Sequence, residues 1–293
     1  MEIYRLDVFT SVPGGGNPTA VIIDDEELSQ AEMQALSTRL EVEAAFVLPP
    51  TRPGANNRLR YFSPAAEMNL CGHATIGALW LLGEQGLGKG ELAVETEAGV
   101  LDCEIEFEAG KLARAVMSQP VPVFEESNFD RNLVAQALGL DVSQIGEPLV
   151  AASTGRPKLL IPLADYNTLD AIRLEQEAHT LLCQRHGLTG LYPYTLEPRN
   201  TAEDVTAEAR QFPYGIGLLE DPVTGVAMGA LAGWLLQSGV IAATPPVTRL
   251  TFEQGHAMGR NGRAEIFIST DQGRISDIRL GGVAVRIPEE VRL

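Results

Sequence analysis

Asn69-Leu-Cys-Gly-His-Ala-Thr-Ile-Gly-Ala-Leu-Trp-Leu-Leu82 combines a glycine turn and a histidine with the start of an apolar helix. The first N–H groups of a helix have no partners within the helix, so this turn predicts an anion-binding site with a proton-transfer group beside it. A second stretch repeats the plan near the other end of the chain, with an aspartate in place of the histidine: Glu220-Asp-Pro-Val-Thr-Gly-Val-Ala-Met-Gly-Ala-Leu-Ala-Gly-Trp-Leu-Leu236. Two such helix starts in one chain predict a site built between two halves.

Both predicted helices are apolar on nearly every side, so each must be enclosed by protein rather than lie on a surface. At an offset of about 150 residues, Gly72 meets Gly225 and Leu82 meets Leu235, which is a weak but ordered internal repeat. The sequence therefore predicts an α/β fold of the α+β type with two pseudo-symmetric halves. Each half is expected to be a bent, mostly antiparallel sheet, or an incomplete barrel, around one buried helix.

Local patterns predict the elements around these helices. Alternating residues on both sides of a glycine turn predict a β-hairpin over residues 3–23. Ser29 and Glu32 form a capping-box pattern before an amphipathic helix that ends before Glu41. Glu43 is expected in the middle of a strand over Glu41–Leu48. Further strands are predicted at 59–63, 91–97, 100–107, 111–118, 148–152, 158–163, 190–196, 205–212, 264–270 and 275–287, and a further helix at 174–185.

The length of 293 residues lies near the upper limit for one domain, so two domains are expected. Segment 119–126 contains two prolines and no helical period, and it is the predicted linker. The N-terminal half is expected to comprise residues 1–118 plus a returning last strand at 280–293. The C-terminal half is expected to comprise residues 119–279.

Composition argues against several classes of partner. The formal net charge is −17, from 22 basic and 39 acidic residues, which disfavours binding to nucleic acids and to anionic membrane surfaces. No run of eighteen apolar residues and no signal-peptide pattern occurs in the sequence, so a cytoplasmic protein is expected. The three cysteines are widely spaced and are expected to be reduced thiols.

Glu43, His73 and Asp221 are the candidate proton-transfer groups. Glu43 would share a strand face with Glu41, and two such carboxylates are also typical of a solvated face. Burial would instead suit Glu43 to act as a general acid or base. His73 has an alternative as a capping or core histidine, and Asp221 has one as an N-cap or turn residue.

The backbone of the two turns offers hydrogen-bond donors for a substrate. If the two helix starts converge, the N–H groups of Gly72 and Gly225 can hold a carboxylate or a developing oxyanion. One such donor typically contributes about 3 to 4 kcal/mol to transition-state stabilisation.

Other chemistries have less support in the sequence. Cys71 is a candidate thiol base of a racemase, but that mechanism needs a second thiol, and the second turn offers none. Cys71 is therefore expected to be a packed residue at the helix start. The four histidines lack the spacing of a metal site, and neither a P-loop nor a dinucleotide fingerprint occurs. We therefore expect no metal and no cofactor.

Motifs in order along the whole chain resemble the PhzF family, the phenazine-biosynthesis-type isomerases with a diaminopimelate-epimerase-like fold. Cys-Gly-His-Ala-Thr together with Asp-Pro-x-Thr-Gly is a specific combination. The matching pieces are Asp7-Val-Phe-Thr10, Gly16-Asn-Pro-Thr-Ala-Val21, Glu43-Ala-Ala-Phe-Val47, Arg60-Tyr-Phe-Ser-Pro64 with Glu67, Cys71-Gly-His-Ala-Thr75, Gly217 to Glu220 with Asp221-Pro-Val-Thr-Gly225, and Gln254-Gly with Met258-Gly-Arg260.

The resemblance implies a cofactor-independent isomerase, usually a homodimer, that acts on a small carboxylate-bearing metabolite. It implies that Glu43 shuttles a proton between substrate carbons, while His73 and Asp221 orient the substrate and assist proton movement. The substrate-binding positions that it implies are Asn17, Gly72, Thr224 and Gly225.

Two departures from the family motifs leave the substrate open. Val226 stands where the family often has a serine, and Asn261-Gly262 stands where it often has Pro-Ser. An amino-acid-type epimerase or racemase is the enzymatic alternative. A catalytically silent small-molecule-binding protein of the same fold is the other.

Overall fold

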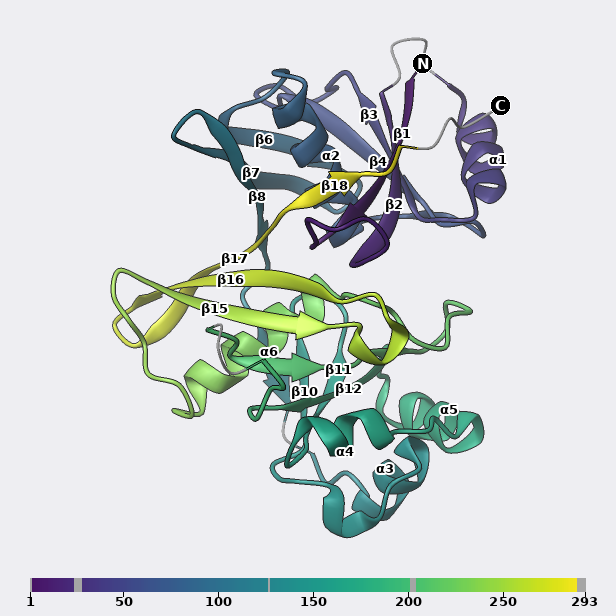
Figure 1. Ribbon diagram of the computed structural model, residues 1–293, viewed down its shortest axis with the longest axis vertical. Coiled ribbons are helices and arrows are strands. Elements are labelled where there is room, and N and C mark those ends of the chain that lie inside the picture. The colour runs from purple at the N-terminus through teal and green to yellow at the C-terminus, as the bar shows by residue number, and fades with distance from the viewer. Residues whose placement is uncertain (1, 24–27, 126, 201–203, 289–293) are drawn as a thin grey trace. The chain divides into compact units, whose positions relative to one another are not determined.

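The computed structural model describes residues 2–23, 28–125, 127–200 and 204–288 (Figure 1). The chain divides into two compact units, which are treated separately below. Unit 1 comprises residues 1–118 and 281–293, and unit 2 comprises residues 119–280.

Unit 1 begins with the predicted hairpin, in which β1 and β2 pair in antiparallel register. Most other strand pairs of this unit are antiparallel as well, while β3 runs parallel to β2 and β6 runs parallel to β4. The last strand, β18, returns to pair with β1. The elements are β1 Glu2–Val8, β2 Asn17–Ile23, α1 Gln30–Leu40, β3 Ala44–Leu48, β4 Asn57–Phe62, β5 Glu67–Met68, α2 Gly72–Glu84, β6 Gly90–Thr96, β7 Gly99–Glu108, β8 Lys111–Gln119 and β18 Ala284–Arg286.

Helix α1 has the predicted capping box, in which the Ser29 side chain accepts from the Glu32 N–H and the Glu32 side chain accepts from the Ser29 N–H. The helix ends where expected, but the strand predicted over Glu41–Leu48 starts later than its pattern indicates. Glu41 is the C-cap of α1 in the left-handed conformation, and β3 starts only at Ala44. Glu43 therefore lies on the short connection that enters β3 and shares no strand face with Glu41.

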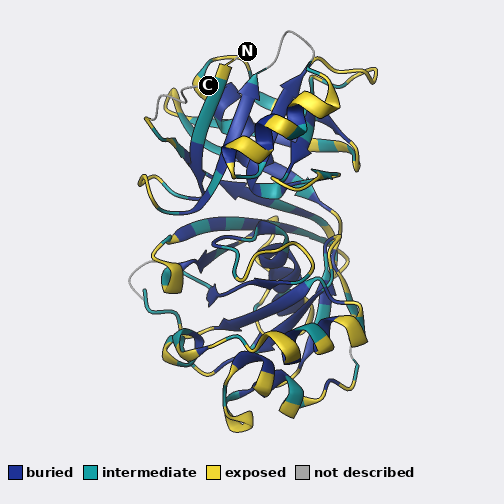
Figure 2. Cartoon of the chain, turned by 90° about the vertical axis from the view of Figure 1, so that its right-hand side faces the viewer, coloured by how far each residue is buried: buried dark blue, intermediate teal, exposed yellow. Residues whose placement is uncertain are grey.

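Helix α2 is enclosed, as its composition predicts. All but three of its residues are buried, and it packs against β1, β2, β3, β7 and β18. Gly77 allows α2 to lie close to β2, because a Cβ at this position would lie only 3.0 Å from the Thr19 Cγ2 atom. Figure 2 shows that exposed residues gather in loops and on the outer faces of helices, while the strands are mostly buried or intermediate.

Unit 2 is also mostly antiparallel, with parallel pairs between β11 and β12 and between β13 and β15. Its elements are β9 Val123–Glu125, α3 Arg131–Leu138, a 3-10 turn at Val142–Gln144, β10 Val150–Ser153, β11 Lys158–Pro162, α4 Tyr166–Ala171, α5 Gln176–His186, β12 Gly190–Thr195, β13 Ala207–Ala209, β14 Phe212–Pro213, α6 Gly225–Gln237, β15 Val247–Gln254, a 3-10 turn at His256–Met258, β16 Gly262–Asp271 and β17 Arg274–Gly282.

Helix α6 is the buried helix of unit 2 and, like α2, has 13 residues. Two of its glycines allow close approach: a Cβ at Gly229 would lie 2.1 Å from the Gln119 Oε1 atom, and one at Gly233 would lie 2.4 Å from the Pro122 Cγ atom. The prediction of mostly antiparallel sheets with one buried helix each is confirmed.

Unit 2 also contains a helical layer that the repeat did not predict. Helices α3, α4 and α5 lie together beside β11 and β12 and share an apolar core with them (Figure 1). The sequence patterns did not predict α3, α4 or β15. Helix α3 has readable end signals, since Asp130 caps its N-terminus and Gly139 follows its C-terminus in the left-handed conformation.

Across the residues that the structure describes, each helix is too short or too polar to cross a membrane.

Candidate active site

The backbone of Glu43 is fixed by the neighbouring strand β2. Its carbonyl oxygen accepts hydrogen bonds from the Ala20 N–H at 3.2 Å and from the Thr19 hydroxyl at 2.8 Å. The carboxylate is 24% exposed, so it is held in place and still open to a ligand.

Helix α2 brings two further reactive side chains to the Glu43 carboxylate. His73, in the first turn, places Nε2 3.3 Å from the Glu43 Oε2 atom. Cys71, the N-cap, places Sγ 3.4 Å from the same oxygen and 3.6 Å from the His73 Nδ1 atom. Both side chains are buried. The sequence favoured Cys71 as a packed residue over a thiol base of a racemase; the residue is buried, and its thiol contacts both groups.

Buried hydrogen bonds from Tyr61 through Thr75 hold the backbone of Cys71 in place. The Thr75 hydroxyl donates to the Cys71 carbonyl oxygen at 2.7 Å, and Thr75 Oγ1 lies 2.7 Å from the Tyr61 hydroxyl. Burial raises the pKa of Tyr61, so the phenol stays neutral. These bonds fix the turn from which Cys71 and His73 project.

Asn17 begins β2 and is buried, on the strand that also anchors Glu43. The turn before it is tight: the Gly14 N–H donates to the Asp7 carboxylate at 2.7 Å, and a Cβ at Gly16 would lie 2.1 Å from the Val8 carbonyl oxygen. Gly16 is therefore required by the close approach of the backbone, which positions Asn17.

In unit 2, Asp221 stands in a turn that is bonded on both sides. Its N–H donates to the Gln211 carbonyl oxygen at 3.0 Å, and its own carbonyl oxygen accepts from the Gln254 Nε2 atom at 2.6 Å. Its carboxylate accepts from the Thr224 hydroxyl, and the Gln254 Oε1 atom accepts from the Thr224 N–H at 3.2 Å. Gln254 thus links Asp221 to the N-cap of α6.

Gly225 is the first residue of α6, as Gly72 is of α2, which matches the predicted repeat. A Cβ at Gly225 would lie 2.3 Å from the Leu280 Cδ2 atom, so the tight packing requires a glycine. The expectation that Asp221 replaces His73 in the repeated plan is wrong in register. His73 follows Gly72 within the helix, whereas Asp221 precedes the N-cap Thr224.

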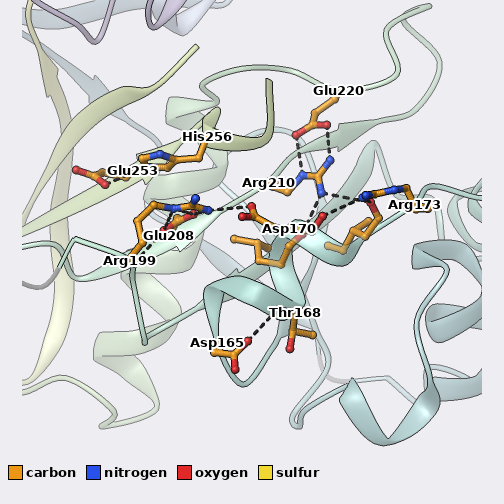
Figure 3. Close-up of polar contacts among 12 residues, drawn as sticks. Asp165, Thr168, Asp170, Arg173, Arg199, Glu208, Arg210, Glu220, Glu253 and His256 are labelled. Atoms are coloured by element: carbon orange, nitrogen blue, oxygen red, sulfur yellow. Dashed lines mark hydrogen bonds and ion pairs between the residues drawn. The ribbon is translucent and has the colours of Figure 1, made fainter. Parts of the chain in front are cut away.

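Arg210 holds the residue next to Asp221. Its Nε and Nη2 atoms donate to the two carboxylate oxygens of Glu220 at 2.9 and 2.7 Å, and its Nη1 donates to the Leu169 carbonyl oxygen at 2.9 Å (Figure 3). The Arg210 residue is 8% exposed. Sequence reasoning missed this pair because nothing local marks Arg210 as buried.

A second arginine of unit 2, Arg199, pairs with carboxylates other than those of Glu220 and Asp221. Figure 3 shows Arg199 between Glu208 and Asp170. Its Nη2 atom lies 2.6 Å from the Glu208 carboxylate and 2.8 Å from the Asp170 carboxylate. This pair is a natural comparison for Arg210.

Lys158 in β11 is, like Arg210, a buried cation of unit 2. It is 3% exposed, and its Nζ donates to the Thr189 hydroxyl at 3.2 Å. Burial and the charge of Arg156 lower the pKa of Lys158 to about 8, and the charge of Asp221 opposes that change. Lys158 therefore lies close enough to Asp221 for the carboxylate to affect its pKa. The periodicity of the strand alone did not predict this proximity.

Comparison with known proteins places these residues in context. The sequence model of the PhzC-PhzF family, described as phenazine biosynthesis-like protein, matches residues 6–290. An uncharacterized isomerase, YddE, of Escherichia coli (strain K12) is 32% identical over 290 residues, which cover 97% of this chain and 95% of that protein. The trans-2,3-dihydro-3-hydroxyanthranilate isomerase of Pseudomonas fluorescens is 31% identical over 256 residues, which cover 87% of this chain and 86% of that enzyme.

Solved structures give the same picture for the fold. The phenazine biosynthesis protein of the PhzF family from Bacillus anthracis aligns with a TM-score of 0.88 and 29% identity, covering 98% of both chains. A probable proline racemase from Agrobacterium radiobacter K84 aligns with a TM-score of 0.63 and 13% identity, covering 99% of this chain and 92% of that one, which is a likeness of fold alone. The predicted fold class is confirmed.

Proposed function

Because the chain belongs to the PhzC-PhzF family of phenazine biosynthesis-like isomerases, we propose that it shifts a proton between carbon atoms of a small metabolite that bears a carboxylate. The reaction proceeds by general acid/base catalysis and without a cofactor. Glu43 removes the proton from one carbon and returns it to another.

The observation that carries this proposal is the contact between Glu43 and its two neighbours. The Glu43 Oε2 atom lies 3.3 Å from His73 Nε2 and 3.4 Å from Cys71 Sγ. A proton-carrying carboxylate works best when it is positioned by hydrogen bonds and still reaches the substrate. The fixed backbone and the partly exposed carboxylate of Glu43 meet both conditions.

The remaining site residues are proposed to bind and orient the substrate. His73 and Asp221 direct the reacting group and assist proton movement. The N–H groups of Gly72 in unit 1 and of Gly225 in unit 2, each in the first turn of its buried helix, are the proposed donors to a carboxylate, because those groups have no partner within the helix. Asn17 and Thr224 complete the binding set.

Solvent deuterium uptake tests the assignment of the base. The substrate panel starts from trans-2,3-dihydro-3-hydroxyanthranilate, the substrate in the name of the Pseudomonas fluorescens relative, and extends to other small unsaturated carboxylates. We expect deuterium at a substrate carbon, with Glu43→Gln lowering the exchange rate by about 10² to 10⁴.

Glu41→Gln is the matched control, since Glu41 is an exposed carboxylate two residues away at the end of α1. It should leave the exchange rate unchanged. An exchange rate in folded Glu43→Gln equal to that of the wild type would refute the role of Glu43.

An epimerase of two thiols would need a second reactive thiol besides Cys71, whose Sγ contacts Glu43 and His73. Cys103 and Cys183 are both buried, and burial raises the pKa of Cys183 to about 12. Chiral analysis of the product distinguishes the reactions: an inverted stereocentre without a shifted double bond would favour an epimerase. Tight binding without turnover would favour a silent binding protein.

The homodimer and the cytoplasmic location stay predictions.

A further inference from the structure

Three different metal-ligand atoms meet at the Glu43 cluster. The Glu43 carboxylate, the Cys71 thiol and the His73 imidazole each offer one donor, and these donors all lie within 4.8 Å of one another. Glu43 lies on the connection into β3, and Cys71 and His73 lie at the start of α2. The backbone at both places is held by regular secondary structure.

The distances between the donors fit a tetrahedral zinc ion. Zinc bonds of about 2.3 Å to sulfur, 2.05 Å to nitrogen and 2.1 Å to oxygen imply separations near 3.6 Å for S···N, 3.6 Å for S···O and 3.4 Å for N···O. The corresponding distances are 3.8 Å between Cys71 Sγ and His73 Nε2, 3.4 Å between Cys71 Sγ and Glu43 Oε2, and 3.3 Å between His73 Nε2 and that oxygen. Each differs from the zinc value by about 0.2 Å or less.

The orientation of the imidazole is the one feature that must adjust. Cys71 Sγ lies almost equally far from the two ring nitrogens, at 3.6 Å from Nδ1 and 3.8 Å from Nε2. A rotation of the ring about its Cβ–Cγ bond changes the direction of the Nε2 lone pair while moving the Nε2 atom little, because this atom lies close to the rotation axis. Rotation about this bond is soft in a histidine side chain.

We propose that Glu43, Cys71 and His73 form a binding site for Zn²⁺, with the fourth coordination position open. A thiolate, an imidazole and a carboxylate together select a borderline-soft ion over Mg²⁺ or Ca²⁺, which prefer oxygen donors alone. On binding, the Cys71 thiol releases its proton to solvent and a Zn–S bond forms. No oxidation or reduction takes place.

The effect on activity rests on the proposed function. An ion on Oε2 withdraws negative charge from the whole Glu43 carboxylate, so the remaining oxygen is a much weaker base toward a proton on carbon. Zn²⁺ is therefore a reversible inhibitor of the isomerase, released by a chelator. This site also revises the expectation of no metal, which rested on the spacing of histidines alone.

Cobalt(II) tests the binding site without any assay of activity. The probe is added to the full, reduced and metal-free chain. We expect a near-ultraviolet charge-transfer band of a Co²⁺-thiolate bond, with one Co²⁺ per chain, and its loss when Zn²⁺ is added. Cys71→Ser should abolish the band, while Cys183→Ala, which removes a buried thiol of unit 2, should keep it.

Circular dichroism checks that each variant folds. A second variant tests the site independently of Cys71. Glu43→Gln keeps the thiolate band but should weaken Zn²⁺ binding by more than about 100-fold, beyond the 10- to 100-fold loss typical of second-shell changes. Absence of the band in the wild type, or its persistence in Cys71→Ser, overturns the proposed site.

Activity measurements separate this inference from the proposed function. A wild-type chain that shows the band but turns over no substrate of the panel contradicts the proposed function and leaves the metal site standing. A chain that isomerises its substrate at full rate with Zn²⁺ bound overturns the inhibitory role.

Discussion

Replacing Lys158 by methionine should change the pH dependence of stability. The ammonium group is buried, with Arg156 and Asp221 as the charged groups that face it, Cys183 as the nearby thiol and Thr189 as its hydrogen-bond acceptor. Burial and Arg156 lower its pKa from 10.5 to about 8. One pKa unit corresponds to 1.36 kcal/mol, so the charged form costs the folded state about 3 kcal/mol at pH 7.

The sign follows from proton binding. Between pH 8 and pH 10.5, the unfolded chain keeps the proton of Lys158 and the folded chain has released it. The unfolded state then binds more protons, so this group makes the folded state more stable as the pH rises. Between pH 7 and pH 9.5, the gain in the free energy of unfolding from Lys158 is about 2 kcal/mol, and Lys158→Met loses it.

Urea denaturation at pH 7 and pH 9.5 measures the effect, with the wild type and Lys158→Met compared at each pH. The difference removes the contribution of the buried tyrosines, which both proteins share. Lys111→Met, a change at an exposed lysine, is the control and should not alter the pH dependence. The methionine variant also loses the attraction to Asp221, so only the change with pH is diagnostic. Parallel pH profiles for the wild type and Lys158→Met would refute the reasoning.

Two further substitutions in unit 2 test how the Asp221 turn is held. Arg210→Met leaves the Glu220 carboxylate without its arginine and should lower the free energy of unfolding by about 3 kcal/mol. It should also lower kcat/KM, whereas Arg199→Met should cost similar stability with kcat/KM unchanged; equal kinetic effects would contradict a specific role for Arg210. Gly225→Ala forces a Cβ to within 2.3 Å of a buried Leu280 methyl and should cost about 1 to 3 kcal/mol in urea denaturation. An unchanged denaturation midpoint for this variant would show that Leu280 can move freely.

Much of the fold is readable from local sequence. The hairpin, the capping box at Ser29 and the two buried helices depend on residues that are neighbours along the chain. The same kind of signal marks α3 at Asp130 and Gly139, although the internal repeat does not include this helix. The strand predicted over Glu41–Leu48 began three residues too early, because the C-cap of α1 at Glu41 turns the chain before β3 starts at Ala44.

In the candidate site, too, the residues could be predicted from local sequence, whereas their contacts could not. Glu43, His73 and Asp221 stand in recognisable motifs, so the sequence alone singled them out. The contact of Cys71 with Glu43, across 28 positions of the chain, required the fold. So did the burial of Arg210 against Glu220.

The sequence by itself determined the two buried helices, the first hairpin, most of the strands and the side chains that carry reactive groups, because helix caps, turn glycines and periodicity act between near neighbours. Only the tertiary structure decided which of those groups meet. Strand β3 lies parallel to β2, so the Glu43 carbonyl is held by Thr19 and Ala20, and α2 packs on the same strands with Cys71 and His73 at its start. Such meetings depend on strand register and helix packing, which are set by the burial of the whole apolar core rather than by any one stretch of chain.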